Sequence, residues 1–169
     1  MIVLDLNRPP DDAPMCPGAS NTELCPTRFF TGEPLYKPVR EPSPVERVAR
    51  RTTYWQPYHA ALADELSRIK AAHGYALLWD AHSIRSQIPW LFEGRLPDLN
   101  IGTADGASAY ASIAQAVMGA LATATSVQSD PVPNAQEVSS VLNGRFKGGY
   151  TTRHYDAAKA AQIKPTLRP

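Results

Sequence analysis

Hydrophobic and polar positions divide the chain into alternating kinds of segment. Apolar runs at 2–4 and 75–79 and the short segment 138–142 have the length of buried strands, and polar residues follow each of them. The segments 43–73 and 107–124 instead carry apolar residues at helical spacing. Because strands and helices alternate along the chain, the pattern predicts an α/β fold with a mixed, partly parallel sheet flanked by helices.

The longer helix has boundary signals of its own. Ser43 begins the sequence Ser-Pro-Val-Glu, which predicts an N-cap with proline in the first turn and a glutamate three residues on. Gly74 is a predicted left-handed C-cap, and Pro57 should kink the helix or divide it in two. We interpret His59 and His73, which lie on this helix, as packing or surface residues.

Two regions are rich in turn-forming residues. Nine of the 16 prolines fall within the first 44 residues, yet apolar residues punctuate this stretch. We therefore expect 9–42 to be an ordered loop that wraps a single domain spanning 1–155, with 156–169 as a divergent tail. Prolines and glycines between 89 and 106 also predict a loop.

Charge and cysteine content narrow the classes of protein. The 169 residues include 17 basic and 16 acidic ones, a near balance that argues against nucleic acid or an anionic membrane as partner. No apolar stretch approaches the ~18 residues of a membrane span, and a basic leader is missing, so we expect a cytoplasmic protein. Cys16 and Cys25 then predict free thiols. Arg47, Arg50 and Arg51 predict a solvated helix face.

Polar clusters follow the three predicted strands, at 5–8, 80–85 and 143–154. If the strands are parallel, these clusters meet at one sheet edge and form a strongly cationic cleft. Several arginines there predict an anionic ligand with more than one carboxylate, because no phosphate-binding loop follows any of the strands. Alternatively, acidic and basic residues within a cluster pair with one another and have only a structural role.

His82 is the strongest candidate for chemistry in the second cluster. It could be a metal ligand, a general base, or a histidine satisfied by a backbone carbonyl, and its place after a predicted strand favours the metal ligand. Asp80 could orient the His82 ring or merely cap the following turn. His154, in the third cluster, is equally compatible with a site and a structural role.

These clusters resemble the N-formylglutamate amidohydrolase (N-formylglutamate deformylase) family. The resemblance covers residues 2 to about 155. It is carried by DLNR at 5–8, LCPT at 24–27, GEPLY at 32–36, YWQPYHAAL at 54–62, the run DAHSIRSQIPWLFEGRLPDLNIGTADGAS at 80–108, and NGRFKGGYTTRHY at 143–155.

The resemblance implies an enzyme that releases formate from N-formyl-L-glutamate, a small anionic substrate, during histidine catabolism. It also implies a fold similar to zinc carboxypeptidases (phosphorylase/hydrolase-like) and a divalent metal, zinc, that activates water. The implied catalytic residues are Asp80 and His82, the implied metal ligand is His82, and the implied substrate-binding residues are Asn7, Arg8, Arg85, Arg145, Arg153 and His154.

Two departures from the family pattern leave a second hypothesis open. Family members are longer, and they carry an upstream histidine motif and a downstream glutamate that this sequence does not show. The chain therefore resembles a family member truncated at both ends, with an incomplete fold. It is either a metal-dependent amidohydrolase or a catalytically inactive remnant that binds carboxylates without a complete metal site.

Overall fold

The structure is a computed structural model that describes residues 3–12, 23–29, 31–89, 92–123 and 138–155. The chain divides into two compact units, Met1–Ala81 and His82–Pro169. The elements in chain order are α1 (Pro44–Arg50), the π-helix η1 (Arg51–Trp55), α2 (Gln56–His73), β1 (Leu99–Ile101), α3 (Ala111–Ala122), β2 (Ser140–Leu142) and α4 (Tyr150–His154).

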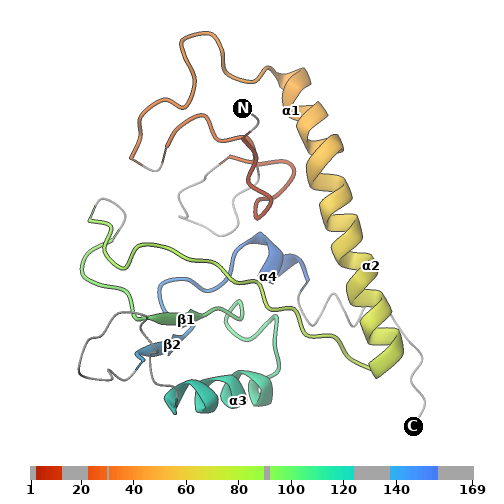
Figure 1. The fold of residues 1–169 in the computed structure, drawn as a ribbon, viewed down its shortest axis with the longest axis vertical. Coiled ribbons are helices and arrows are strands. Elements are labelled where there is room, and N and C mark those ends of the chain that lie inside the picture. Colours follow the sequence, from red (N-terminus) through yellow and green to blue (C-terminus); the bar gives the residue numbers. More distant parts are fainter. Residues whose placement is uncertain (1–2, 13–22, 30, 90–91, 124–137, 156–169) are drawn as a thin grey trace, which may run out of the picture. The chain divides into compact units, whose positions relative to one another are not determined.

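One long helical rod, built from α1, η1 and α2, dominates the first unit (Figure 1). Both predicted caps are confirmed. The Ser43 hydroxyl accepts a hydrogen bond from the Glu46 amide at 3.2 Å, and Gly74 adopts φ 80° while its amide donates to the Lys70 carbonyl at 2.8 Å. The helix is not divided at Pro57. The π-helical turn just before it, with its wider hydrogen-bond spacing, accommodates the missing proline donor.

The segment 3–12 is held by side chains of this rod rather than by a sheet. Val3 and Leu4 form no strand, so that prediction is wrong; Ile2 lies outside the described residues. Four carbonyls of the segment are instead hydrogen-bonded to side chains of the helix. The bonds run from Arg50 Nη1 to Val3 O (3.1 Å), Arg51 Nη1 to Pro10 O (3.2 Å), Trp55 Nε1 to Arg8 O (2.9 Å) and His59 Nε2 to Leu6 O (2.9 Å).

The same bonds overturn the prediction of a solvated arginine face. Arg50 is only 6% exposed, and Arg47 pairs with Glu23 at 3.3 Å. The charges point inward because the irregular segments beside the helix present carbonyls and carboxylates that need donors. His59 is buried and His73 is exposed, so their interpretation as packing and surface residues is confirmed.

The described part of 9–42 contains a tight turn. Phe29 and Leu35 donate backbone hydrogen bonds to Glu33 and Thr27, both at 2.9 Å. Cys25 is a buried free thiol, whereas Cys16 lies outside the described residues. A single domain over 1–155, with this loop wrapping it, stays a prediction, as does the divergent tail at 156–169, which also lies outside the described residues.

The second unit contains a two-stranded parallel sheet. Strands β1 and β2 pair with Asn100 opposite Val141, and α3 crosses between them and packs against β2, as parallel strands require. A mixed α/β fold with a small parallel sheet is thus confirmed. Strand β1 lies within 89–106, where a loop was predicted. The three residues Leu99–Ile101 are too short, and too closely flanked by proline and glycine, to show strand periodicity.

The predicted strand at 75–79 is also wrong. This stretch, all of it described, has an irregular backbone, and Tyr75, Leu77 and Trp79 are 73%, 61% and 60% exposed. An apolar run becomes a strand only when a neighbouring strand supplies backbone partners, which composition alone does not specify.

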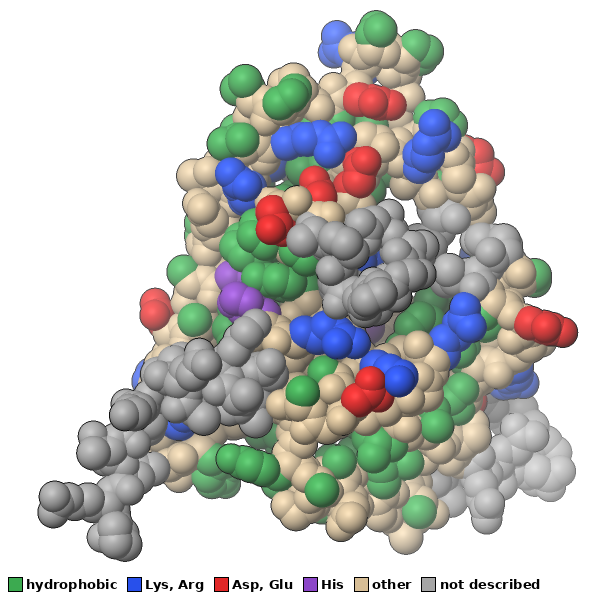
Figure 2. Space-filling model, turned by 180° about the vertical axis from the view of Figure 1, so that it is seen from behind, with side chains coloured by type: hydrophobic (Ala, Val, Ile, Leu, Met, Phe, Trp, Pro, Cys, Tyr) green, Lys and Arg blue, Asp and Glu red, His purple; other side chains and the backbone are tan. Residues whose placement is uncertain are grey.

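Ile88, Phe92 and Leu96 form a small buried apolar cluster in the second unit. Phe92 also meets Phe146 edge to face, with ring centroids 6.5 Å apart, which joins the loop before β1 to the loop after β2. On the face shown in Figure 2, lysine and arginine side chains are interspersed with aspartate and glutamate. Among the described helices, none is both long and apolar enough to cross a bilayer.

Candidate functional site

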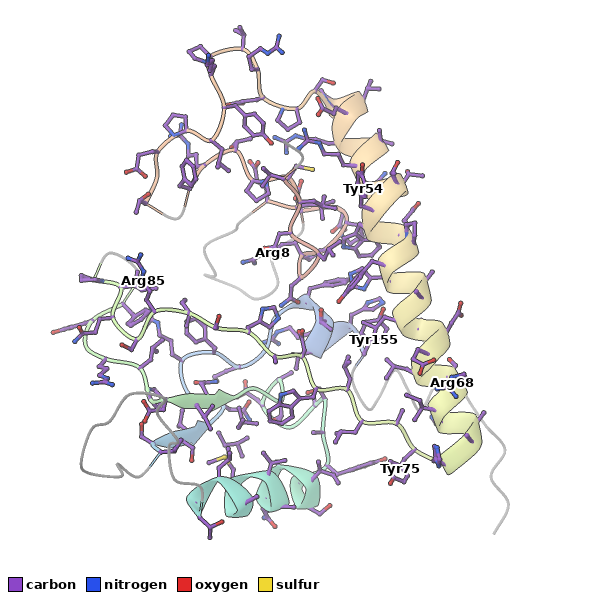
Figure 3. All side chains as sticks on the ribbon, in the orientation of Figure 1. Arg8, Tyr54, Arg68, Tyr75, Arg85 and Tyr155 are labelled. Atoms are coloured by element: carbon purple, nitrogen blue, oxygen red, sulfur yellow. The ribbon has the colours of Figure 1, made fainter. Side chains whose placement is uncertain are left out.

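In the first unit, Asp5 organises the residues that follow it. Its Oδ1 accepts from the Asn7 amide at 2.9 Å, and its Oδ2 lies 3.2 Å from Arg8 Nε. The ion pair is partly buried, since the Arg8 side chain is 18% and the Asp5 side chain 35% exposed. Figure 3 shows Arg8 extending away from the long helix. The local pair therefore orients the guanidinium.

Asp80, His82 and Arg85 lie on an exposed, irregular stretch. The boundary between the two units falls after Ala81, so Asp80 belongs to the first unit and His82 begins the second. These residues do not follow a strand, because 75–79 is not one. Their catalytic, metal-binding and substrate-binding roles stay predictions, and so does the convergence of the three polar clusters on one cleft.

In the second unit, Asn143 binds the loop after β1 to the loop after β2. Its Oδ1 accepts from the Thr103 amide and its Nδ2 donates to Thr103 Oγ1, both at 2.8 Å. Thr103 is only 5% exposed, so this pair of bonds is shielded from water. The Ala104 amide also donates to the Lys147 carbonyl, at 2.6 Å. The carboxyl ends of the two parallel strands are thus fastened together, the usual place for a ligand in an α/β sheet.

The backbone of these loops is unusual. Ala104, Asp105 and Asn143 all have positive φ, at 50°, 56° and 49°. Such conformations are uncommon for residues other than glycine and concentrate at functional sites. Their grouping at the carboxyl ends of β1 and β2 marks this part of the unit as a candidate site.

Cationic side chains of the third cluster surround this point. Lys147 Nζ lies 3.0 Å from an Asp105 carboxylate oxygen, and Arg145 lies over the Phe92 ring, 4.9 Å from its centroid. Arg153 Nε donates to the Gly148 carbonyl at 3.2 Å. These contacts are made by the charged end of each side chain, and Arg145 and Lys147 are themselves exposed.

His154 is held by two tyrosines within the short helix α4 and its end. Its ring stacks on Tyr150 with centroids 4.8 Å apart and an interplanar angle of 18°, and it meets Tyr155 edge to face. Tyr150 Oη and His154 Nδ1 are 3.0 Å apart. This packing gives the ring a defined position, while its substrate-binding role stays a prediction.

Sequence reasoning missed Thr103, Asn100 and Asp105. Asn100 exchanges side-chain hydrogen bonds with the backbone of Phe146, and Asp105 pairs with Lys147. The available signal was the sequence Gly-Thr-Ala-Asp-Gly directly after Ile101. It could be recognised only once Leu99–Ile101 was known to be a strand.

The described residues do not by themselves make a metal centre. A catalytic zinc needs about three protein ligands plus water. Across the described ranges, no three His, Cys, Asp or Glu side chains come together to offer them. The metal expected from the resemblance therefore does not fit this set of residues alone.

Comparison with known proteins identifies the class. A family model described as N-formylglutamate amidohydrolase matches residues 2–164. The chain is 51% identical over 158 residues to an N-formylglutamate deformylase of Pseudomonas putida, covering 93% of this chain and 55% of that protein. It is 50% identical over 153 residues to an N-formylglutamate deformylase of Pseudomonas aeruginosa, covering 90% and 53%. No solved structure matches.

The chain has an α/β fold with polar loops at the ends of its parallel strands, and the family model matches it along nearly its whole length. The chain belongs to the N-formylglutamate amidohydrolase family. It spans about half the length of the curated relatives it matches.

Proposed function

We propose that this chain forms part of an N-formylglutamate deformylase. In the reaction, a water oxygen adds to the formyl carbon of N-formyl-L-glutamate and the C–N bond breaks. The products are formate and L-glutamate, whose amine takes up a proton. The observation that carries the proposal is the 51% identity to the Pseudomonas putida deformylase over 93% of this chain.

The substrate has two carboxylates, and the proposal assigns the cationic residues to them. Asn7 and Arg8 bind one carboxylate. Support comes from Asp5, which holds Arg8 Nε at 3.2 Å and so fixes the planar guanidinium that carboxylates prefer. The remaining proposed substrate-binding residues are Arg85, Arg145, Arg153 and His154.

Asp80 and His82 are the proposed catalytic residues, with His82 also a proposed ligand of a divalent metal, zinc. The described residues alone offer no three-ligand group for that metal. The proposal further includes a zinc-carboxypeptidase-like fold, a role in histidine catabolism and a cytoplasmic location. The cytoplasm is reducing and keeps thiols free, so the free thiol of Cys25 supports this location.

A second candidate is a carboxylate-binding domain without turnover. The lack of a three-ligand group among the described residues favours this candidate. A clamp such as Asn7–Arg8 needs no metal ligands to bind a dicarboxylate. The two candidates differ in turnover but share the ligand.

Formate release from N-formyl-L-glutamate, measured with and without added zinc, tests the proposal. Turnover by the wild type that His82→Ala abolishes is the expected result. Turnover unchanged in His82→Ala contradicts the role of His82. A folded protein that binds the substrate calorimetrically without releasing formate favours the second candidate, and a folded protein that neither binds nor hydrolyses contradicts both.

A further inference from the structure

We infer that Trp55 and His59 are positioning residues for the proposed carboxylate clamp, which consists of Asn7 and Arg8. They fix the backbone of Leu6 and Arg8 and thereby set where the Asn7 and Arg8 side chains lie. The inference rests on the proposed function for its consequence in binding, but the positioning itself can be measured separately.

The geometry brackets the clamp from both sides. Trp55 Nε1 donates to the Arg8 carbonyl at 2.9 Å, and His59 Nε2 lies 2.9 Å from the Leu6 carbonyl. Asn7 lies between these two anchored residues. Trp55 and His59 are 9% and 5% exposed, so their bonds compete little with water. Because both acceptors are backbone atoms, the bonds fix the backbone conformation independently of the side chains of residues 6 and 8.

The two donors also support one another. The rings of Trp55 and His59 lie 4.2 Å apart between centroids and are tilted by 41°, and Tyr58 meets His59 edge to face. A carbonyl can only accept, so His59 must carry its proton on Nε2 to bond Leu6. Burial lowers the pKa of His59, which favours the neutral ring with that single proton.

The π-helical turn η1 explains how one helix face reaches so far along the segment. Arg51, Trp55 and His59 follow one another at intervals of four residues. In a regular α-helix, with roughly 3.6 residues per turn, side chains at this interval shift progressively around the helix axis. The wider π turn at Arg51–Trp55 offsets part of that drift. All three side chains therefore bond carbonyls of the same short segment.

The experiment removes one donor at a time. Trp55→Phe keeps an aromatic ring but loses the N–H. Tyr54→Phe is the matched control, because it removes one polar hydrogen from a neighbouring ring that is 44% exposed (Figure 3). His59→Leu removes the second donor, whereas His59→Gln retains an Nε2–H at a similar reach. Each variant is measured by amide hydrogen exchange of segment 3–10, by circular dichroism, and by calorimetric titration with N-formyl-L-glutamate.

Trp55→Phe and His59→Leu should speed exchange in segment 3–10 by about tenfold, as expected for the loss of one hydrogen bond. Helix content should stay unchanged, and affinity should weaken by a similar factor. Tyr54→Phe should match the wild type, and His59→Gln should recover most of the His59→Leu loss. Wild-type exchange in both donor-removing variants overturns the inference, and so does faster exchange with unchanged affinity.

The two proposals fail in different ways. If the wild type binds neither N-formyl-L-glutamate nor L-glutamate, the proposed function fails. Exchange in segment 3–10 still decides whether Trp55 and His59 position it. Faster exchange spread equally over the whole chain would indicate general destabilisation and would also overturn the inference.

Discussion

Gly102, directly after β1, is a residue at which a single added methyl group should be strongly destabilising. A Cβ added there would lie 2.7 Å from the Gly148 nitrogen and 2.8 Å from the Lys147 carbonyl carbon. Both atoms belong to the backbone, so neither can turn away as a flexible side chain could. The close approach is what allows the Ala104 amide to bond the Lys147 carbonyl.

The cost of Gly102→Ala follows from these contacts. Overpacking against atoms that cannot rotate away costs about 1–3 kcal/mol, and losing the Ala104–Lys147 hydrogen bond adds about 1 kcal/mol. The free energy of unfolding should therefore fall by about 2–4 kcal/mol.

Gly119→Ala is the matched control, since it is the same substitution within the same unit. Gly119 lies inside α3 with no atom within 4 Å of an added Cβ, so alanine should stabilise the helix by up to about 1 kcal/mol. Urea unfolding followed by circular dichroism measures both. Free energies of unfolding within about 0.5 kcal/mol of each other would refute the steric reasoning.

Three further predictions concern the first unit. Ser43→Ala should lower the free energy of unfolding by about 1 kcal/mol through loss of the N-cap, with Ser43→Thr close to wild type; equal urea midpoints for Ser43→Ala and wild type would count against the cap. Because burial lowers the pKa of His59, the unfolded chain takes up a proton first as the pH falls, and stability is lost below about pH 6.5. The wild-type urea midpoint should thus fall more than that of His59→Gln between about pH 7.5 and about pH 5.5, and parallel falls would contradict this. Burial also raises the pKa of the Cys25 thiol, so alkylation of Cys25, followed by peptide mapping, should be at least about tenfold slower in the folded chain than in urea; equal rates would show the thiol is accessible.

Local signals predicted local structure well. Ser43 and Gly74 bound the long helix as their capping chemistry requires, because a cap depends on a few neighbouring residues. The helix in 107–124 was also found, since its apolar residues recur four positions apart, and so was the strand in 138–142.

Pairing between distant residues could not be predicted in the same way. The stretch 75–79 is as apolar as a strand yet pairs with no strand among the described residues, whereas Leu99–Ile101 pairs with β2 despite its brevity. The choice depends on which backbone groups meet in three dimensions, and no local pattern records that.

The candidate site shows the same contrast between local signals, which the sequence reveals, and contacts between distant residues, which it does not. The residue types of the clusters at 5–8 and 143–154 indicated cationic chemistry. The Asn143–Thr103 bonds and the anchoring of Arg8 by Trp55 required the structure, because each joins residues about 40 or more positions apart in the sequence. Arg50 was misread for the same reason, since its partners Val3 and Tyr36 lie far from it along the chain.

The most direct test of the account is whether Arg8 binds a substrate carboxylate. Calorimetric titration with N-formyl-L-glutamate compares the wild type, Arg8→Gln and Arg68→Gln. Arg68, an exposed residue of α2 paired with Glu65 at 2.6 Å, serves as the control (Figure 3). The account predicts that Arg8→Gln weakens binding by about ten- to hundredfold, the loss of a charge-assisted hydrogen bond, while Arg68→Gln binds as the wild type does. Equal affinity in Arg8→Gln and the wild type would contradict it.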